Sequence, residues 1–77
     1  MTTYNGHKNW NYWNVSLWIN NDEGLYNKAR DCVRSAKTKT RAAEVMLQFL
    51  RDGGYEKTPD GAPYTKSAVR AAMSGME

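Results

Sequence analysis

The sequence has one cysteine, two prolines and no apolar run of the length that a membrane span requires. Because Cys32 stands alone, the chain cannot form an internal disulfide, which argues against the small, disulfide-stapled scaffolds of secreted proteins. The first ten residues, MTTYNGHKNW, lack the basic and apolar regions of a signal peptide. We therefore expect a cytoplasmic protein that makes no membrane contact.

Residue patterns that carry catalysis or hold cofactors are also missing. The sequence has no glycine-rich phosphate loop, no paired cysteine or histidine ligands and no serine in a nucleophile elbow. His7 has neither a second histidine nor a nearby cysteine, which disfavours a metal site. His7 and Cys32 could form a thiol–imidazole pair, but Cys32 lies on the apolar stripe of a predicted helix. We therefore expect no enzymatic activity and no cofactor, and a protein that acts by binding.

The 77 residues suffice for one domain, which at this size buries only about 60% of its unfolded surface. Three tryptophans compensate for this small buried fraction, because each aromatic side chain can bury roughly 150–250 Å². They are concentrated in residues 9–19 (NWNYWNVSLWI). At helical pitch this stretch is apolar nearly all round, a pattern typical of a buried helix. We expect a central helix, capped by Asn9, with its tryptophans in the core; the alternative leaves one tryptophan exposed as a binding anchor.

A second helix is expected after Asn20 and Asn21, either of which can cap it. Its core stripe consists of Leu25, Ala29, Cys32, Val33 and Ala36. Six of the eleven basic residues fall within residues 28–41, namely Lys28, Arg30, Arg34, Lys37, Lys39 and Arg41. Only Asp31 opposes them, and such a patch favours phosphate backbones or acidic protein surfaces. A merely solvated helix face is the alternative for Arg30, Arg34 and Lys37.

A third helix is predicted over residues 41–52, ended by a left-handed cap at Gly53-Gly54. Its expected core residues are Ala42, Ala43, Met46, Phe49 and Leu50. A bend at Pro59-Asp60-Gly61 precedes a last helix that begins after Thr65 and ends at Gly75. That helix turns Ala68, Val69, Ala72 and Met73 inward and Lys66 and Arg70 outward.

The fold class that follows is all-α, with about four helices in a single domain over residues 1–77. Residues 1–8 form an extended arm, residues 9–36 the tryptophan-rich and basic helices, and residues 40–74 a unit of helix–turn–helix outline.

Two resemblances add to this interpretation. The run from Leu50 to Met73 resembles the start of the DNA-binding domain of large serine recombinases. The matching positions are Leu50, Gly54, Thr58, Pro59, Gly61, Tyr64, Thr65, Ser67, Val69 and Arg70. Tyr64 stands where tryptophan is commoner, and one extra residue separates Gly54 from Thr58. The motif is mostly structural, so it supports the local fold better than DNA binding.

The pattern from Tyr4 to Tyr26, YNGHKNWNYWNVSLWINNDEGLY, resembles an uncharacterised domain of small phage and mobile-element proteins. The sequence departs from the usual pattern of that domain at Asn11 and Tyr12. The resemblance implies a phage or plasmid origin, and hence the cytoplasm of the host cell.

Three functions remain open. The first is a counter-defence inhibitor of the anti-CRISPR kind, docking on a host defence complex that handles nucleic acid. The second is a small regulator that binds double-stranded DNA, as a homodimer if its sites are palindromic. The third is a structural or assembly module. The candidate binding residues for the first two are Arg30, Arg34, Lys37, Lys39, Arg41, Thr65, Lys66, Ser67 and Arg70.

Overall fold

The computed structural model describes residues 9–74 and 76, and over these residues the chain is all-α, as predicted. The helices are α1 (Trp10–Asn21), α2 (Glu23–Ser35), α3 (Lys39–Asp52) and α4 (Lys66–Ala72). The predicted arm over residues 1–8 lies outside the described residues. The last helix was predicted to end at Gly75, which also lies outside them, but α4 already ends at Ala72.

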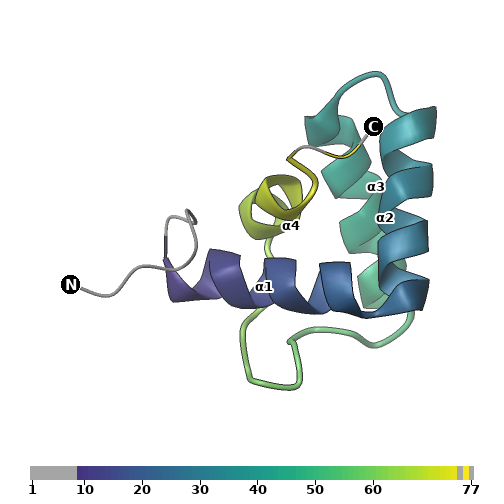
Figure 1. Cartoon of the computed structure of the whole chain (residues 1–77). Helices are drawn as coiled ribbons and strands as arrows, with labels where there is room; N and C mark the ends of the chain where they lie inside the picture. The colour runs from purple at the N-terminus through teal and green to yellow at the C-terminus, as the bar shows by residue number, and fades with distance from the viewer. Residues whose placement is uncertain (1–8, 75, 77) are drawn as a thin grey trace.

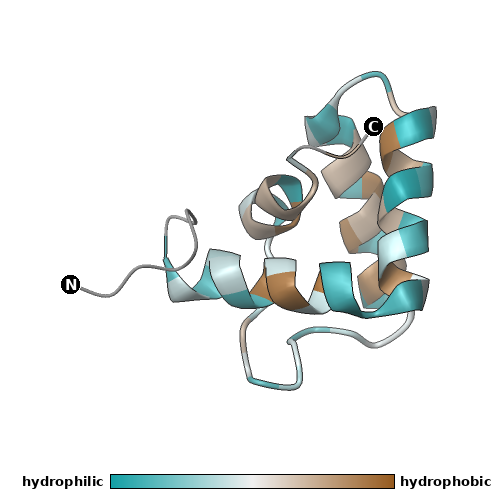
Figure 2. Cartoon of the chain, viewed as in Figure 1, coloured by the Kyte–Doolittle hydropathy of each residue, from teal (hydrophilic) through white to brown (hydrophobic). Residues whose placement is uncertain are grey.

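The helices contact one another in a closed ring. The contacts run from α1 to α2, from α2 to α3, from α3 to α4 and from α4 back to α1. In Figure 1, α2 and α3 stand side by side as an antiparallel hairpin, α1 runs across their lower ends, and α4 lies between α1 and the upper part of α3. Hydrophilic residues cover much of the visible face of α2 in Figure 2, whereas the middle of α1 is apolar. The core fills the inside of this ring.

The predicted core faces of α3 and α4 are confirmed with one exception. The buried apolar residues of these two helices and their caps are Ala42, Ala43, Met46, Leu47, Leu50, Ala68, Val69, Ala72 and Met73. Phe49, expected in the core, is 39% exposed. The reason is that α3 turns its buried face to α2 and α4, and Phe49 lies on the flank of that face.

The tryptophans were expected in the core, and this prediction is wrong. Trp10 is 40% exposed, while Trp13 and Trp18 are half-buried. The buried residues of α1 are instead Asn14, Val15, Ser16 and Ile19. Among the helices α1 contacts α2 and α4, so it is a side of the ring rather than its centre. Its exposed residues, Trp10, Asn20 and Asn21, lie at its two ends.

Side-chain caps begin each helix. Asn9 accepts a hydrogen bond from the backbone N–H of Tyr12 at 3.0 Å, as predicted for α1, and Thr65 caps α4, also as predicted. For α2 the predicted asparagine caps are wrong, because α1 continues through Asn21. The Asp22 carboxylate caps α2 by accepting from the N–H of Leu25 at 3.0 Å.

The connection between α3 and α4 runs from residue 53 to residue 65. Gly54 and Gly61 have φ values of +81° and +97°, so both predicted turns use the left-handed region that favours glycine. The connection folds back on itself, with an antiparallel bridge between Lys57 and Pro63. It is far longer than the turn of about three or four residues that joins the helices of a helix–turn–helix.

A polar network, buried at Asn14 and Thr58 and exposed at Asp60, fastens this connection to α1. The Asn14 amide donates to Asp60 Oδ2 at 2.9 Å, and Trp18 Nε1 donates to the same oxygen at 2.9 Å. The Thr58 hydroxyl donates to Asn14 Oδ1 and accepts from the N–H of Ala62 at 3.0 Å. These bonds fix the loop against α1 and, with it, the entry into α4. The donors from Asn14 and Trp18 lower the pKa of the Asp60 carboxyl.

Candidate binding groove on helix α3

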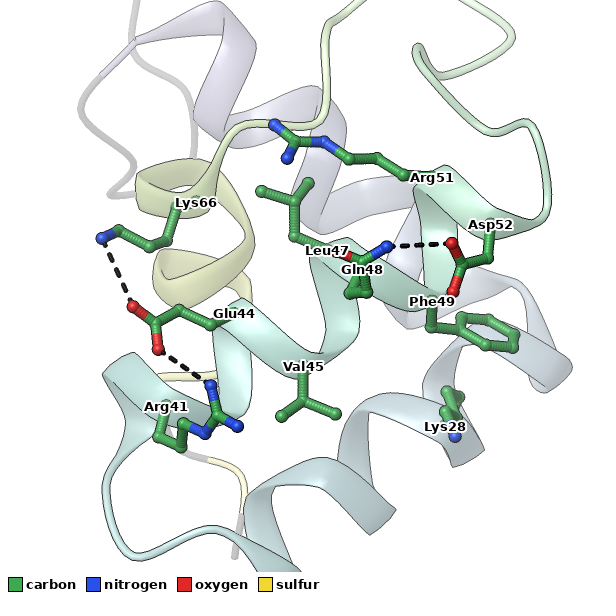
Figure 3. A pocket seen from close by; sticks show the side chains of 10 residues that line it. All are labelled: Lys28, Arg41, Glu44, Val45, Leu47, Gln48, Phe49, Arg51, Asp52 and Lys66. Atoms are coloured by element: carbon green, nitrogen blue, oxygen red, sulfur yellow. Dashed lines mark hydrogen bonds and ion pairs between the residues drawn. The ribbon is translucent and has the colours of Figure 1, made fainter.

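A groove of about 860 Å³ follows the outer flank of α3, between α2 and α4 (Figure 3). Most of its residues belong to α3; Lys28 of α2 borders one side and Lys66 of α4 the other. Four basic and two acidic side chains line it, which gives a net charge of +2. They are Lys28, Arg41, Arg51 and Lys66 against Glu44 and Asp52.

The centre of the groove is apolar and open to solvent. Val45 is 38% exposed and Phe49 39% exposed, and they lie four residues apart on the same face of α3. The ammonium of Lys28 lies 4.9 Å from the centroid of the Phe49 ring, a cation–π contact that holds a charge over the aromatic face. An exposed apolar centre is thus surrounded by charged groups.

Glu44 organises the end of the groove near the start of α3. Its Oε1 lies 3.4 Å from Arg41 Nη1 and its Oε2 lies 3.7 Å from Lys66 Nζ. Figure 3 shows these two pairs on either side of Glu44. All three side chains are substantially exposed, so the pairs add little to stability. Their effect is to hold two cations from different helices at one edge of the groove.

At the opposite end of the groove, a hydrogen bond joins two residues of α3. The Gln48 amide donates to Asp52 Oδ1 at 2.9 Å. This carboxylate and that of Glu44 therefore place negative charge toward both ends of a groove whose remaining charges are positive. A uniformly anionic ligand such as a phosphate backbone would meet repulsion at both points.

The structure separates the sequence-predicted binding residues. Of these, it brings Arg41 and Lys66 together in the groove. Arg70 lies against α3, where its Nε donates to Thr40 Oγ1 at 2.9 Å. Thr65 serves as the cap of α4, with its hydroxyl oxygen 3.5 Å from that of Ser67.

The other predicted residues lie on or near the hairpin of α2 and α3. The guanidinium of Arg30 lies 5.7 Å from the ring centroid of Tyr26 on the same helix. Where the hairpin turns, four basic residues gather at what we call the basic end. These are Arg34, Lys37, Lys39 and Arg41. All are exposed except Lys39, which is half-buried.

Sequence reasoning missed the apolar centre of the groove. Phe49 was assigned to the core because it is close in helical position to Met46 and Leu50, and Val45 was assigned no role. The available signal is that Val45 and Phe49 form their own row at a spacing of four, beside the Ala42–Met46–Leu50 row. Over the described residues, α2 and α4 bury the Ala42–Met46–Leu50 row, whereas Val45 and Phe49 stay partly exposed.

Outside the groove, the single thiol is protected. Cys32 is 3% exposed, and burial raises its pKa, with the Lys28 charge acting in the opposite direction. Over residues 9–74 and 76, no group of three or more histidine, cysteine, aspartate or glutamate side chains is placed to hold a metal ion. No helix in that part of the chain combines the length and apolar character of a membrane span.

Comparison with known proteins assigns the chain to a family but gives no function for it. Neither the curated proteins nor the solved structures include a match. A family model matches over residues 1–77, the full length of the sequence, and its description reads family of unknown function, DUF7249. The chain therefore belongs to the DUF7249 family.

Proposed function

We propose that the protein is a non-catalytic inhibitor of the counter-defence kind, which docks its α3 groove on a protein subunit of a host nucleic-acid-handling complex. The observation that carries the proposal is the exposure of Val45 and Phe49 inside a ring of charged side chains. Protein interfaces have this anatomy, with an apolar centre, a polar rim, and energy concentrated in aromatic and arginine residues.

Charge favours a protein partner over duplex DNA at this groove. A phosphate backbone would face the carboxylates of Glu44 and Asp52 as well as the cations. A protein surface that alternates acidic side chains with an apolar projection can match both signs of charge, with its apolar part over Phe49. Phe49 is partly exposed, so its ring leaves apolar surface in contact with water that a bound partner would cover.

The test is protection of a phage against CRISPR interference in cells that express the protein. We expect the wild type to restore plating of the targeted phage, and Val45→Ser/Phe49→Ser to lose that protection. Trp10→Ser is the matched control, because Trp10 is similarly exposed and lies on α1, outside the groove. Thermal melts establish that all variants are folded. Absence of protection by the wild type would overturn the counter-defence role, and full protection by the groove variant would overturn docking through α3.

A second candidate, binding to double-stranded DNA, is favoured by the basic end. Its exposed cations lie on two helices and the turn between them. The nearest acidic residues in the sequence are Asp31 and Glu44, and Glu44 is already paired with Arg41. In fluorescence anisotropy with random duplex DNA, affinity should fall as the salt concentration rises. Lys37→Ala/Lys39→Ala should reduce the slope of log affinity against log salt concentration by roughly 2. Lys66→Ala/Arg70→Ala tests whether α4 takes part. Salt-insensitive or absent binding would eliminate this candidate.

A further inference from the structure

A second, aromatic cleft lies where α1, the start of α2 and the loop over residues 53–65 meet. It has a volume of about 210 Å³ and shares no lining residue with the α3 groove. Its apolar lining comprises Trp18, Leu25, Tyr55, Pro59 and Tyr64, and its two charged residues are Asp22 and Lys57. Three aromatic rings from different parts of the chain thus converge on one small cavity.

The rings are held in place and remain partly open to solvent. Tyr55 is 50% exposed and Trp18 is half-buried, whereas Tyr64 is 6% exposed. Trp18 cannot rotate freely, because its Nε1 donates to Asp60 Oδ2 at 2.9 Å. Donation to a carboxylate also polarises the indole and increases the negative character of its ring face. Such faces attract cations, and tryptophan attracts them best.

Asp22 gives the cleft a carboxylate. Its Oδ1 accepts from the N–H of Leu25, and within the described part of the chain its other oxygen accepts no hydrogen bond. Asp22 and Tyr64 line the same cleft, and burial raises the pKa of the Tyr64 hydroxyl, with the Asp22 charge raising it further. Lys57 is the one cation in the lining, and the charge of Asp22 offsets it. The carboxylate of Asp60, which does not line the cleft, adds a negative charge next to the Trp18 ring.

We propose that this cleft binds an arginine side chain presented by a partner protein. A guanidinium is planar, so it can stack on the Trp18 or Tyr55 ring, and its forked donors can pair with the unused oxygen of Asp22. A quaternary ammonium would use the rings alone, because it has no N–H to donate. Arginine would use both the aromatic rings and the Asp22 carboxylate. This binding does not involve the α3 groove.

The test uses the indole N–H signals of the three tryptophans in a two-dimensional NMR spectrum, with Trp18 assigned from its loss in Trp18→Phe. The probe is N-acetyl-arginine-N-methylamide, and the matched control probe is the citrulline equivalent, which has nearly the same shape without the charge. We expect a saturable shift of the Trp18 signal with the arginine probe and little shift with citrulline. The signals of Trp10 and Trp13 should stay in place.

Two variants make the outcome specific. Asp22→Asn removes the charge while keeping a good helix cap, so the domain stays folded and the arginine affinity should fall. Tyr55→Leu keeps an apolar side chain without a π face and should weaken binding about two- to fivefold. Equal shifts from arginine and citrulline, a shift unchanged by Asp22→Asn, or no saturable shift at Trp18 would each overturn the proposal.

Discussion

Replacing Asn14 by alanine should destabilise the protein far more than its place on a helix suggests. Asn14 is 1% exposed and accepts a hydrogen bond from the Thr58 hydroxyl, itself 4% exposed. In Asn14→Ala that buried hydroxyl loses its acceptor. The lost bond to Asp60 adds little, because Asp60 is exposed and water can replace the amide there.

The expected decrease in the free energy of unfolding is the sum of two destabilising effects and one stabilising effect. An unsatisfied buried hydroxyl costs about 1–3 kcal/mol, and the space left by the amide costs about 1 kcal/mol more. Alanine returns about 0.5 kcal/mol through its higher helix propensity. The net loss of roughly 1.5–3.5 kcal/mol corresponds to a melting temperature about 6–28 °C lower for a domain of this size.

The assay is thermal unfolding followed by circular dichroism, with Asn21→Ala as the control. Asn21 is the exposed last residue of α1, so its substitution tests the effect of alanine on the same helix without the buried network. Equal melting temperatures for the two variants would refute the role assigned to the network between α1 and the loop.

Three further predictions concern titration, turn geometry and the thiol. The folded-state pKa of Asp60 lies below its ordinary value of 3.8, so its contribution to stability is present above pH 3.8 and is lost as pH falls through the lower, folded value. Asp60→Asn should flatten that part of the curve of melting temperature against pH. Alanine at Gly54 or Gly61 should cost about 1 kcal/mol in urea unfolding because φ is positive there, and asparagine should cost less. Cys32 should react with a thiol reagent only as fast as the protein opens, so mild denaturant should accelerate labelling; fast labelling without denaturant would contradict its burial.

Local chemistry made much of the fold predictable. The Asn9 and Thr65 caps, the glycines at positive φ and the inward faces of α3 and α4 depend on residues within one or two turns of each other. Residue type at the caps and turns, together with helical spacing, therefore identified them. The same is true of the Cys32 stripe on α2, where Ala29 and Cys32 are buried.

The features that could not be predicted from the sequence depend on packing between residues far apart in the chain. Spacing shows that α1 is apolar on both faces, but not which of its residues meet α2, α4 and the loop, so the exposure of Trp10 was unpredictable. A buried Asn14 likewise depends on partners 44 and 46 residues away. For the groove, Arg41 and Lys66 come together only because α3 and α4 pack, and Phe49 becomes a surface residue for the same reason.

Docking through α3 is tested most directly by comparing two double variants in one phage plating assay under CRISPR interference. Val45→Ser/Phe49→Ser removes the apolar centre of the groove, and Lys37→Ala/Lys39→Ala removes charge from the basic end while leaving the groove intact. Docking on a protein predicts that the first variant loses protection and the second retains it. Loss of protection by the basic-end variant alone would contradict docking through α3 and assign the activity to the basic end.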